Sequence, residues 1–186
     1  MEKNAITSND AGTIISIGEK IIQHHTLITI CTIVNYTFME LKTDKKNIYD
    51  NAKNHFLGNF PASLPIEQAY VHIGIYLGWI IETGLYSEYF EDEASNQIFR
   101  FKRREISCTI LSEIWDGYLG HELFSQTGNM FTYYYYGGGI YRSDYEKLLV
   151  KSLPSIYHVN DTWENYEKIS THITMRFQDW KKLINV

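Results

Sequence analysis

The sequence predicts a mainly α protein, a single-domain helical bundle that follows an N-terminal extension. Two long segments carry this prediction. Residues 65–83 have apolar side chains on nearly every face, as in a helix at the middle of a bundle, and residues 162–184 repeat apolar residues at helical spacing. The composition agrees, because 44% of the 186 residues are apolar, 21% are charged and only three are proline. A chain of this length is most simply one domain with a short extension.

The first segment can be read in two ways. Ile14, Ile17 and Ile21 fit a helical stripe, but residues 13–42 are also rich in the Ile, Val and Thr that favour strands. The pattern therefore leaves this segment open between helix and strand. The hydrophilic residues 42–47 mark a plausible boundary, so we divide the chain into an N-terminal extension (1–46) and a helical domain (47–186).

The predicted central helix covers residues 65–83. Pro65 suits the first turn, because a helix's first residue needs no N–H donor, and Gly84 suits the end, because glycine readily adopts left-handed backbone angles. The stripe Ile66, Tyr70, Ile73 recurs at helical spacing, and apolar residues also occupy the other faces.

Shorter helices are predicted after it. In residues 87–106 acidic side chains come first and basic ones last, an order that a helix dipole favours. Ser107 is expected to cap a short helix that ends by Trp115. Residues 120–136 are expected to form a further helix.

Two capping patterns complete the prediction. Ser143 with Glu146 resembles a capping box that opens a helix through residue 150, and Asp161 with Glu164 resembles a cap for the last helix. No internal repeat interrupts this succession of helices.

The four tyrosines and three glycines of residues 133–139 are the most unusual stretch. No Gly-Lys-Ser/Thr follows them, so a phosphate-binding loop is not indicated. Four consecutive residues span most of a helix circumference, which means that one or two tyrosines should anchor in the core while the others reach the surface. Exposed tyrosines often anchor protein partners, and we predict contact residues at four positions, with an aromatic core edge as the alternative. These positions are Tyr134, Tyr135, Tyr136 and Tyr141.

No motif for a metal site, a cofactor or nucleophilic catalysis is present, and we expect none of the three. There is no His-Glu-x-x-His, Cys-x-x-Cys or Gly-x-Ser-x-Gly sequence. Cys31 and Cys108 are expected to be buried thiols in a reducing compartment. An alternative to a binding protein is an enzyme of unknown type that uses His72, His158 and nearby acids.

The charge balance indicates a protein partner. Seventeen basic against twenty-two acidic residues give a net charge of −5, without the clustered basic excess of nucleic-acid binders. An acidic surface would attract a basic partner. The predicted acidic contact residues are Glu88, Glu91, Asp92 and Glu93. Because the sequence shows neither a signal peptide nor an apolar run long enough to cross a membrane, a cytoplasmic location is expected.

Several segments together resemble a family of uncharacterised bacterial proteins. Its pattern includes Tyr-Asp-x-Ala, Phe-Pro, a His-Ile-Gly-x-x-Leu-x-Trp helix, Asp-Gly and a Tyr-His-Val-x-Asp-Thr-Trp-Glu-Asn-Tyr segment. The resemblance covers residues 49–186. The matching positions are Tyr49, Asp50, Ala52, Phe60, Pro61, His72, Ile73, Gly74, Leu77, Trp79, Asp116, Gly117, Tyr157, His158, Val159 and 161–166.

The resemblance carries over no catalytic residue, because no activity is established for the family. Small proteins of this kind often accompany polymorphic toxins, so the resemblance implies an immunity protein that occludes an antibacterial toxin, such as a nuclease with a basic cleft. The alternatives are the enzyme described above and a regulatory interaction domain. The sequence leaves open the identity of the toxin and the oligomeric state.

Overall fold

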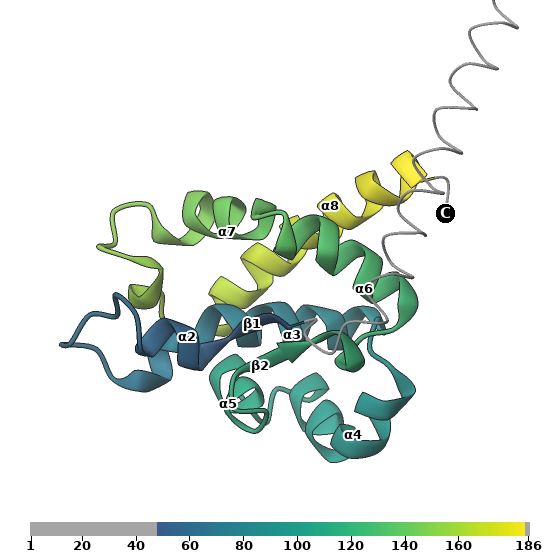
Figure 1. Ribbon diagram of the computed structural model, residues 1–186, viewed down its shortest axis with the longest axis horizontal. Coiled ribbons are helices and arrows are strands. Elements are labelled where there is room, and N and C mark those ends of the chain that lie inside the picture. Colours follow the sequence, from purple (N-terminus) through teal and green to yellow (C-terminus); the bar gives the residue numbers. More distant parts are fainter. Residues whose placement is uncertain (1–47, 185–186) are drawn as a thin grey trace, which may run out of the picture. The chain divides into compact units, whose positions relative to one another are not determined.

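The computed structural model describes residues 48–184, and helix α3 (Val71–Thr83) lies at the centre of this mainly α domain (Figure 1). Every residue from Val71 to Ile81 is buried, which confirms the predicted central helix. The helix ends as predicted, with Gly84 in the left-handed conformation at φ 68°. The predicted N-terminal extension, residues 1–46, lies outside the described residues.

The predicted helix 65–83 consists of two pieces. Pro65 has extended backbone angles and precedes a 3-10 helix, Ile66–Ala69, and α3 starts only after Tyr70. The Tyr70 N–H bonds to the carbonyl of Glu67, which closes the tighter 3-10 turn before the α-helix begins.

Three helices pack on α3. These are α4 (Glu88–Lys102), α5 (Cys108–Glu113) and α8 (Trp163–Ile184). Glycines allow the closest contacts: a Cβ at Gly74 would lie 1.9 Å from the carbonyl oxygen of Cys108, and one at Gly78 would lie 2.4 Å from the Phe101 ring. Because Gly74 has no side chain, the backbone of α3 can pack closely against α5.

Serine caps begin α4 and α5. The Ser87 hydroxyl accepts a bond from the Phe90 N–H, and the Ser107 hydroxyl accepts one from Ile110, which confirms the predicted cap at Ser107. Acidic residues occupy the first turn of α4 and basic residues its last turn, as predicted. Cys108, at the start of α5, is buried, and burial raises the pKa of its thiol well above the usual value. Cys31 lies outside the described residues.

The predicted helix 120–136 is wrong at its start, because Gly120 belongs to a strand of a short antiparallel sheet. Strand β2 (Tyr118–Gly120) pairs with β1 (Ile48–Asn51), with Asp50 opposite Leu119. Helix α2 (Ala52–Phe56) follows β1 directly.

The rest of the predicted 120–136 helix consists of three short segments: a 3-10 helix, an α-helix and a π-helix. A 3-10 turn at His121–Leu123 leads to α6 (Gln126–Thr132), which Ser125 caps, and a π-helical turn at Tyr133–Gly137 follows. The helix starts late because Gly120 and Phe124 have extended backbone angles, so the α-helical ladder cannot pass through them.

Helix α7 (Ile140–Tyr145) begins before the predicted capping box. Gly139 at φ 76° precedes it, and the N–H of Ser143 bonds within the helix to the Gly139 carbonyl, so Ser143 is not a cap. A second π-helical turn, Glu146–Val150, continues α7, and a 3-10 turn at Ile156–His158 leads toward α8.

The cap of α8 is one residue later than predicted. The hydroxyl of Thr162 accepts the Asn165 N–H at 3.2 Å, whereas the Asp161 carboxylate accepts the Thr109 N–H of α5 at 2.8 Å. Asp161 therefore joins two helices that are distant in sequence.

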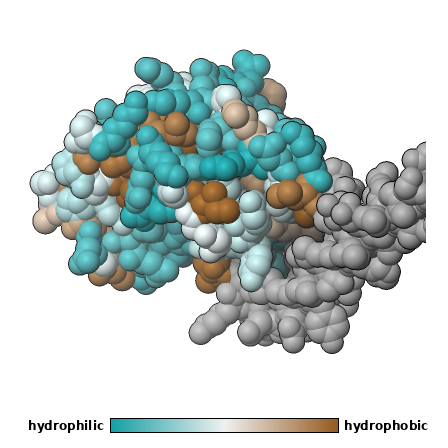
Figure 2. Space-filling model, turned by 90° about the horizontal axis from the view of Figure 1, so that it is seen from above, coloured by the Kyte–Doolittle hydropathy of each residue, from teal (hydrophilic) through white to brown (hydrophobic). Residues whose placement is uncertain are grey.

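Aromatic rings fill the space between α3, α6 and α8. Phe131 lies 5.3 Å from Trp79, 5.0 Å from Phe177 and 5.4 Å from Trp180, measured between ring centroids. The surface seen in Figure 2 is largely hydrophilic, with separate apolar patches. Within residues 48–184, no helix combines the length and the apolar character needed to cross a membrane.

Candidate functional site

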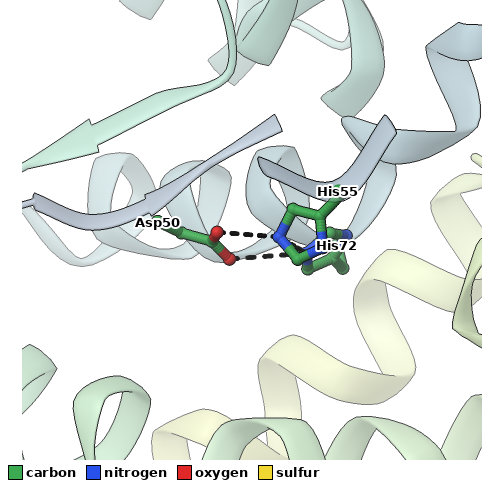
Figure 3. Close-up of side chains that lie close together, drawn as sticks. All are labelled: Asp50, His55 and His72. Atoms are coloured by element: carbon green, nitrogen blue, oxygen red, sulfur yellow. Dashed lines mark hydrogen bonds and ion pairs between the residues drawn. The ribbon is translucent and has the colours of Figure 1, made fainter. Parts of the chain in front are cut away.

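Three side chains from neighbouring elements point toward one another: Asp50 of β1, His55 of α2 and His72 of α3 (Figure 3). We call them the Asp–His cluster. The Asp50 Oδ1 lies 2.7 Å from the His55 Nε2, and the Asp50 Oδ2 lies 3.5 Å from the His72 Nε2. The two histidine Nε2 atoms are 3.3 Å apart.

Local sequence explains how two members meet. Asn51 has extended angles and its side chain accepts the Lys53 N–H, so the chain turns from strand to helix directly after Asp50. One helical turn later, His55 points back at Asp50. The third member, His72, is held in the core by the buried first turn of α3.

Tyrosines surround the cluster. The Tyr136 hydroxyl donates to Asp50 Oδ2, and the Tyr157 hydroxyl lies 3.0 Å from His55 Nδ1. The Tyr141 hydroxyl donates to the His72 main-chain carbonyl at 2.7 Å. The π-helical turn at residues 133–137 presents Tyr136 to Asp50, and such turns are frequent at functional sites.

Burial and hydrogen bonding oppose each other at the charged groups. Burial acts to raise the pKa of Asp50, but the hydrogen bonds from His55 and His72 outweigh it and leave that pKa well below its usual range. Burial lowers the pKa of His72 despite the nearby Asp50. Burial and the Asp50 charge raise the pKa of Tyr136 well above its usual value. At neutral pH Asp50 is therefore a carboxylate and Tyr136 a hydroxyl donor to it.

A cavity of about 60 Å³ adjoins the cluster, enough for at least one water molecule. Two buried polar atoms of its lining residues, His72 Nδ1 and Tyr145 Oη, have no protein partner among residues 48–184. Buried polar groups are nearly always hydrogen-bonded, so the cavity is suited to polar contents. Arg142 and Ile156 line both this cavity and a larger groove of about 500 Å³.

The four predicted acidic contact residues are all exposed. Glu88, Glu91, Asp92 and Glu93 lie in the first turns of α4, and Tyr89 among them is 52% exposed. Within residues 48–184 none of these four carboxylates makes an ion pair, whereas the basic residues near the end of α4 do, as in Arg104–Glu82 at 2.5 Å. The acidic side chains are thus available to a partner.

The predicted tyrosine contacts need correction. Tyr134 is exposed, as is its neighbour Tyr133, but Tyr135 and Tyr141 are buried and cannot touch a partner in this conformation. Tyr136 is half-buried and engaged with Asp50. The prediction that one or two of the four consecutive tyrosines anchor in the core is correct, and the assignment of Tyr135 and Tyr141 to a contact surface is wrong. Their rings pack beside the buried ring of Tyr76 and so form part of the core.

The alternative hypothesis, an enzyme that uses both His72 and His158, finds the two histidines with different partners. His158 Nδ1 lies 2.9 Å from the Ser155 hydroxyl within the same short loop, and it does not line the cavity beside the cluster. The actual partners of His72 are Asp50 and His55. No local motif reveals them, because the three residues come from three different elements.

The chain belongs to a family described as a domain of unknown function (DUF7832), whose profile matches residues 48–159. The match includes the whole Asp–His cluster, its tyrosines and the acidic part of α4, and it ends before α8. Comparison with curated proteins and with solved structures finds no match.

Proposed function

We propose that the protein is a cytoplasmic immunity protein, which binds an antibacterial toxin with a basic surface and occludes its active site. The observation that carries this proposal is the exposed acidic start of α4, defined as Glu88, Tyr89, Glu91, Asp92 and Glu93. We call it the acidic surface.

Electrostatics supports this choice of surface. Four carboxylates without intramolecular ion pairs in the described part of the chain keep their charge available, and the whole chain has a net charge of −5. Such a surface speeds the encounter with a basic partner and disfavours an acidic one. A toxin with a basic nuclease cleft is the partner class with the matching charge.

Tyr89 gives the acidic surface an anchor. Its ring is 52% exposed in the middle of the acids. Tyrosine is enriched among residues that dominate binding energy, because it buries a large rigid area and keeps one polar group. The carboxylates would guide the approach and Tyr89 would supply contact area.

The first experiment tests for the toxin. The product of the adjacent gene is expressed with and without this protein, and we expect it to arrest growth alone and to form a stable complex that restores growth. A neighbouring product that neither binds nor inhibits growth would overturn the immunity proposal.

The second experiment tests the surface. Replacing Glu91, Asp92 and Glu93 with Lys should slow association and reduce its dependence on salt, since the attraction is removed. The matched control replaces three acids outside the acidic surface: Glu113, Glu164 and Asp179. Unchanged association at low salt would show that the acidic surface is only solvated.

A second candidate is an enzyme centred on the Asp–His cluster. It is favoured by the cavity that Asp50, His55 and His72 line together, since carboxylates and imidazoles are the usual proton-transfer groups. An enzyme of this kind would retain its activity when the acidic surface is reversed and lose it in His55→Gln.

A further inference from the structure

We propose that Asp50, His55 and His72 bind one divalent transition-metal ion of the zinc class, through both histidine Nε2 atoms and a carboxylate oxygen of Asp50. This inference goes beyond the proposed immunity function, because it concerns a different part of the molecule. The ion would be bound by the polar side chains of the Asp–His cluster inside the domain.

The distances fit a shared ion. One ligand atom from each of the three residues lies within 4.8 Å of the other two. The His55 Nε2 is 2.7 Å from Asp50 Oδ1, the His72 Nε2 is 3.5 Å from Asp50 Oδ2, and the two Nε2 atoms are 3.3 Å apart. Ligand atoms about 2.0–2.1 Å from one metal ion are about 2.8–3.4 Å apart, for octahedral and tetrahedral geometry respectively. The cluster therefore needs only small side-chain shifts to close on an ion.

The donor set fits as well. Two imidazoles with one carboxylate, leaving further positions open, is an arrangement that binds zinc or ferrous iron. Nitrogen donors disfavour calcium and magnesium, which take oxygen ligands.

Outer hydrogen bonds orient two of the three ligands. His55 Nδ1 lies 3.0 Å from the Tyr157 hydroxyl, so His55 can keep its proton on Nδ1 and direct the Nε2 lone pair inward. The Tyr136 hydroxyl and the Asn51 N–H both donate to Asp50, the latter at 2.7 Å. These bonds fix the carboxylate with its oxygens toward the histidines.

The adjoining cavity supplies the remaining coordination positions. All three ligands line it, and its volume of about 60 Å³ can hold a water molecule on the metal. Such a water could also bond to Tyr145 Oη, a buried atom that lacks a protein partner among the described residues.

One nearby charge opposes a cation. Arg142 lines the cavity, but its Nε is 2.5 Å from the Glu146 carboxylate, which offsets much of its charge. Asp50 supplies the negative charge in direct contact with the ion. The local balance therefore permits a divalent cation.

The test uses the full chain after treatment with a chelator. Zn²⁺ is titrated calorimetrically, and Co²⁺ is followed by visible absorption, which reports coordination geometry. Asp50→Asn and His55→Gln should each bind one ion fewer than the wild type, or should bind that ion more than about 100-fold more weakly. In Tyr157→Phe the affinity should fall by about 10-fold, since only an outer hydrogen bond is lost.

The matched control is His121→Gln. His121 is a partly exposed histidine beside Glu122, with 3.4 Å between Nδ1 and the carboxylate, and its loss should leave the site intact. Any ions bound by the adjacent His24 and His25, which lie outside the described residues, are common to all variants and cancel in the comparison.

A measurement on the wild type needs no folded variant. Zn²⁺ should change the imidazole NMR signals of His55 and His72 and leave those of His121 and His158 in place. The proposal is overturned if wild type, Asp50→Asn and His55→Gln bind metal identically, or if Zn²⁺ moves only the other histidine signals. Toxin binding is measured separately, so failure here leaves the immunity proposal standing.

Discussion

The domain uses acidic side chains in two opposite ways. Asp50 and Asp144 are enclosed by partners from other secondary-structure elements: Asp50 by His55, His72 and Tyr136, and Asp144 by Tyr135, His172 and Arg176. The acids of the acidic surface project from one helix into solvent. A buried carboxylate costs stability unless donors compensate it, whereas an exposed one costs almost nothing and remains free for a partner. The surroundings of an acid, rather than its charge, separate a structural role from the recognition role that we propose for the acidic surface.

The largest expected effect comes from an acid placed in the interior without partners. Ile73 is fully buried in α3, so Ile73→Asp should cost about 5 kcal/mol or more and unfold the domain. Circular dichroism and thermal unfolding measure this. The control is Ile110→Asp in α5, where the side chain is 45% exposed and the new charge stays in water. A folded Ile73→Asp protein with an unchanged melting temperature would contradict the central position of α3.

A smaller effect is expected when a compensated acid is removed. Arg176 donates to both oxygens of Asp144, at 2.8 and 2.9 Å. Asp144→Ala should cost about 2 kcal/mol, because Arg176 is partly exposed and a fully buried pair would cost more. Chemical denaturation measures the difference, with Asp92→Ala as the exposed control.

The same pair gives a pH dependence. Burial acts to raise the pKa of Asp144, but the hydrogen bonds from Arg176 and Tyr135 leave it below its usual value. A depressed pKa stabilises the fold above the ordinary carboxyl pKa of about 4 and loses that contribution as the pH falls. The stability gap between wild type and Asp144→Ala should therefore narrow below about pH 4. A constant gap from pH 7 to pH 3 would show that the Asp144 charge is not what stabilises the pair.

The buried and exposed regions also differ in what the sequence could predict. Helices α3 and α8 could be predicted from the spacing of their apolar residues. The serine cap of α5 could be predicted because it is a hydrogen bond between residues three positions apart. Their causes lie within a few residues. The acidic surface belongs to the same class, since acidic residues clustered at the start of one helix need no tertiary contact to be recognised.

The Asp–His cluster could not be predicted in this way. Asp50 sits on a strand of four residues, too short for an alternating pattern, and His72 reads as one more residue of an apolar helix. Tyr136 reaches Asp50 from a π-helical turn, which the run of tyrosines does not predict. Their meeting depends on the packing of β1, α2, α3 and residues 133–137, which no single segment encodes.

The smallest expected effect separates neighbouring tyrosines of that run. The Tyr135 hydroxyl donates to Asp144 at 3.0 Å within the core, so Tyr135→Phe removes one donor from a buried carboxylate and should cost about 1 kcal/mol. Tyr134 is 41% exposed, and Tyr134→Phe should change stability by less than about 0.5 kcal/mol. Both substitutions keep the ring and remove only the hydroxyl, which makes each the control for the other in chemical denaturation. Equal losses would mean that the interior and surface halves of the run contribute alike, against the placement of Tyr135 beside Asp144. An effect confined to Tyr135 would assign the buried hydroxyl to the fold and leave Tyr134 free for a partner.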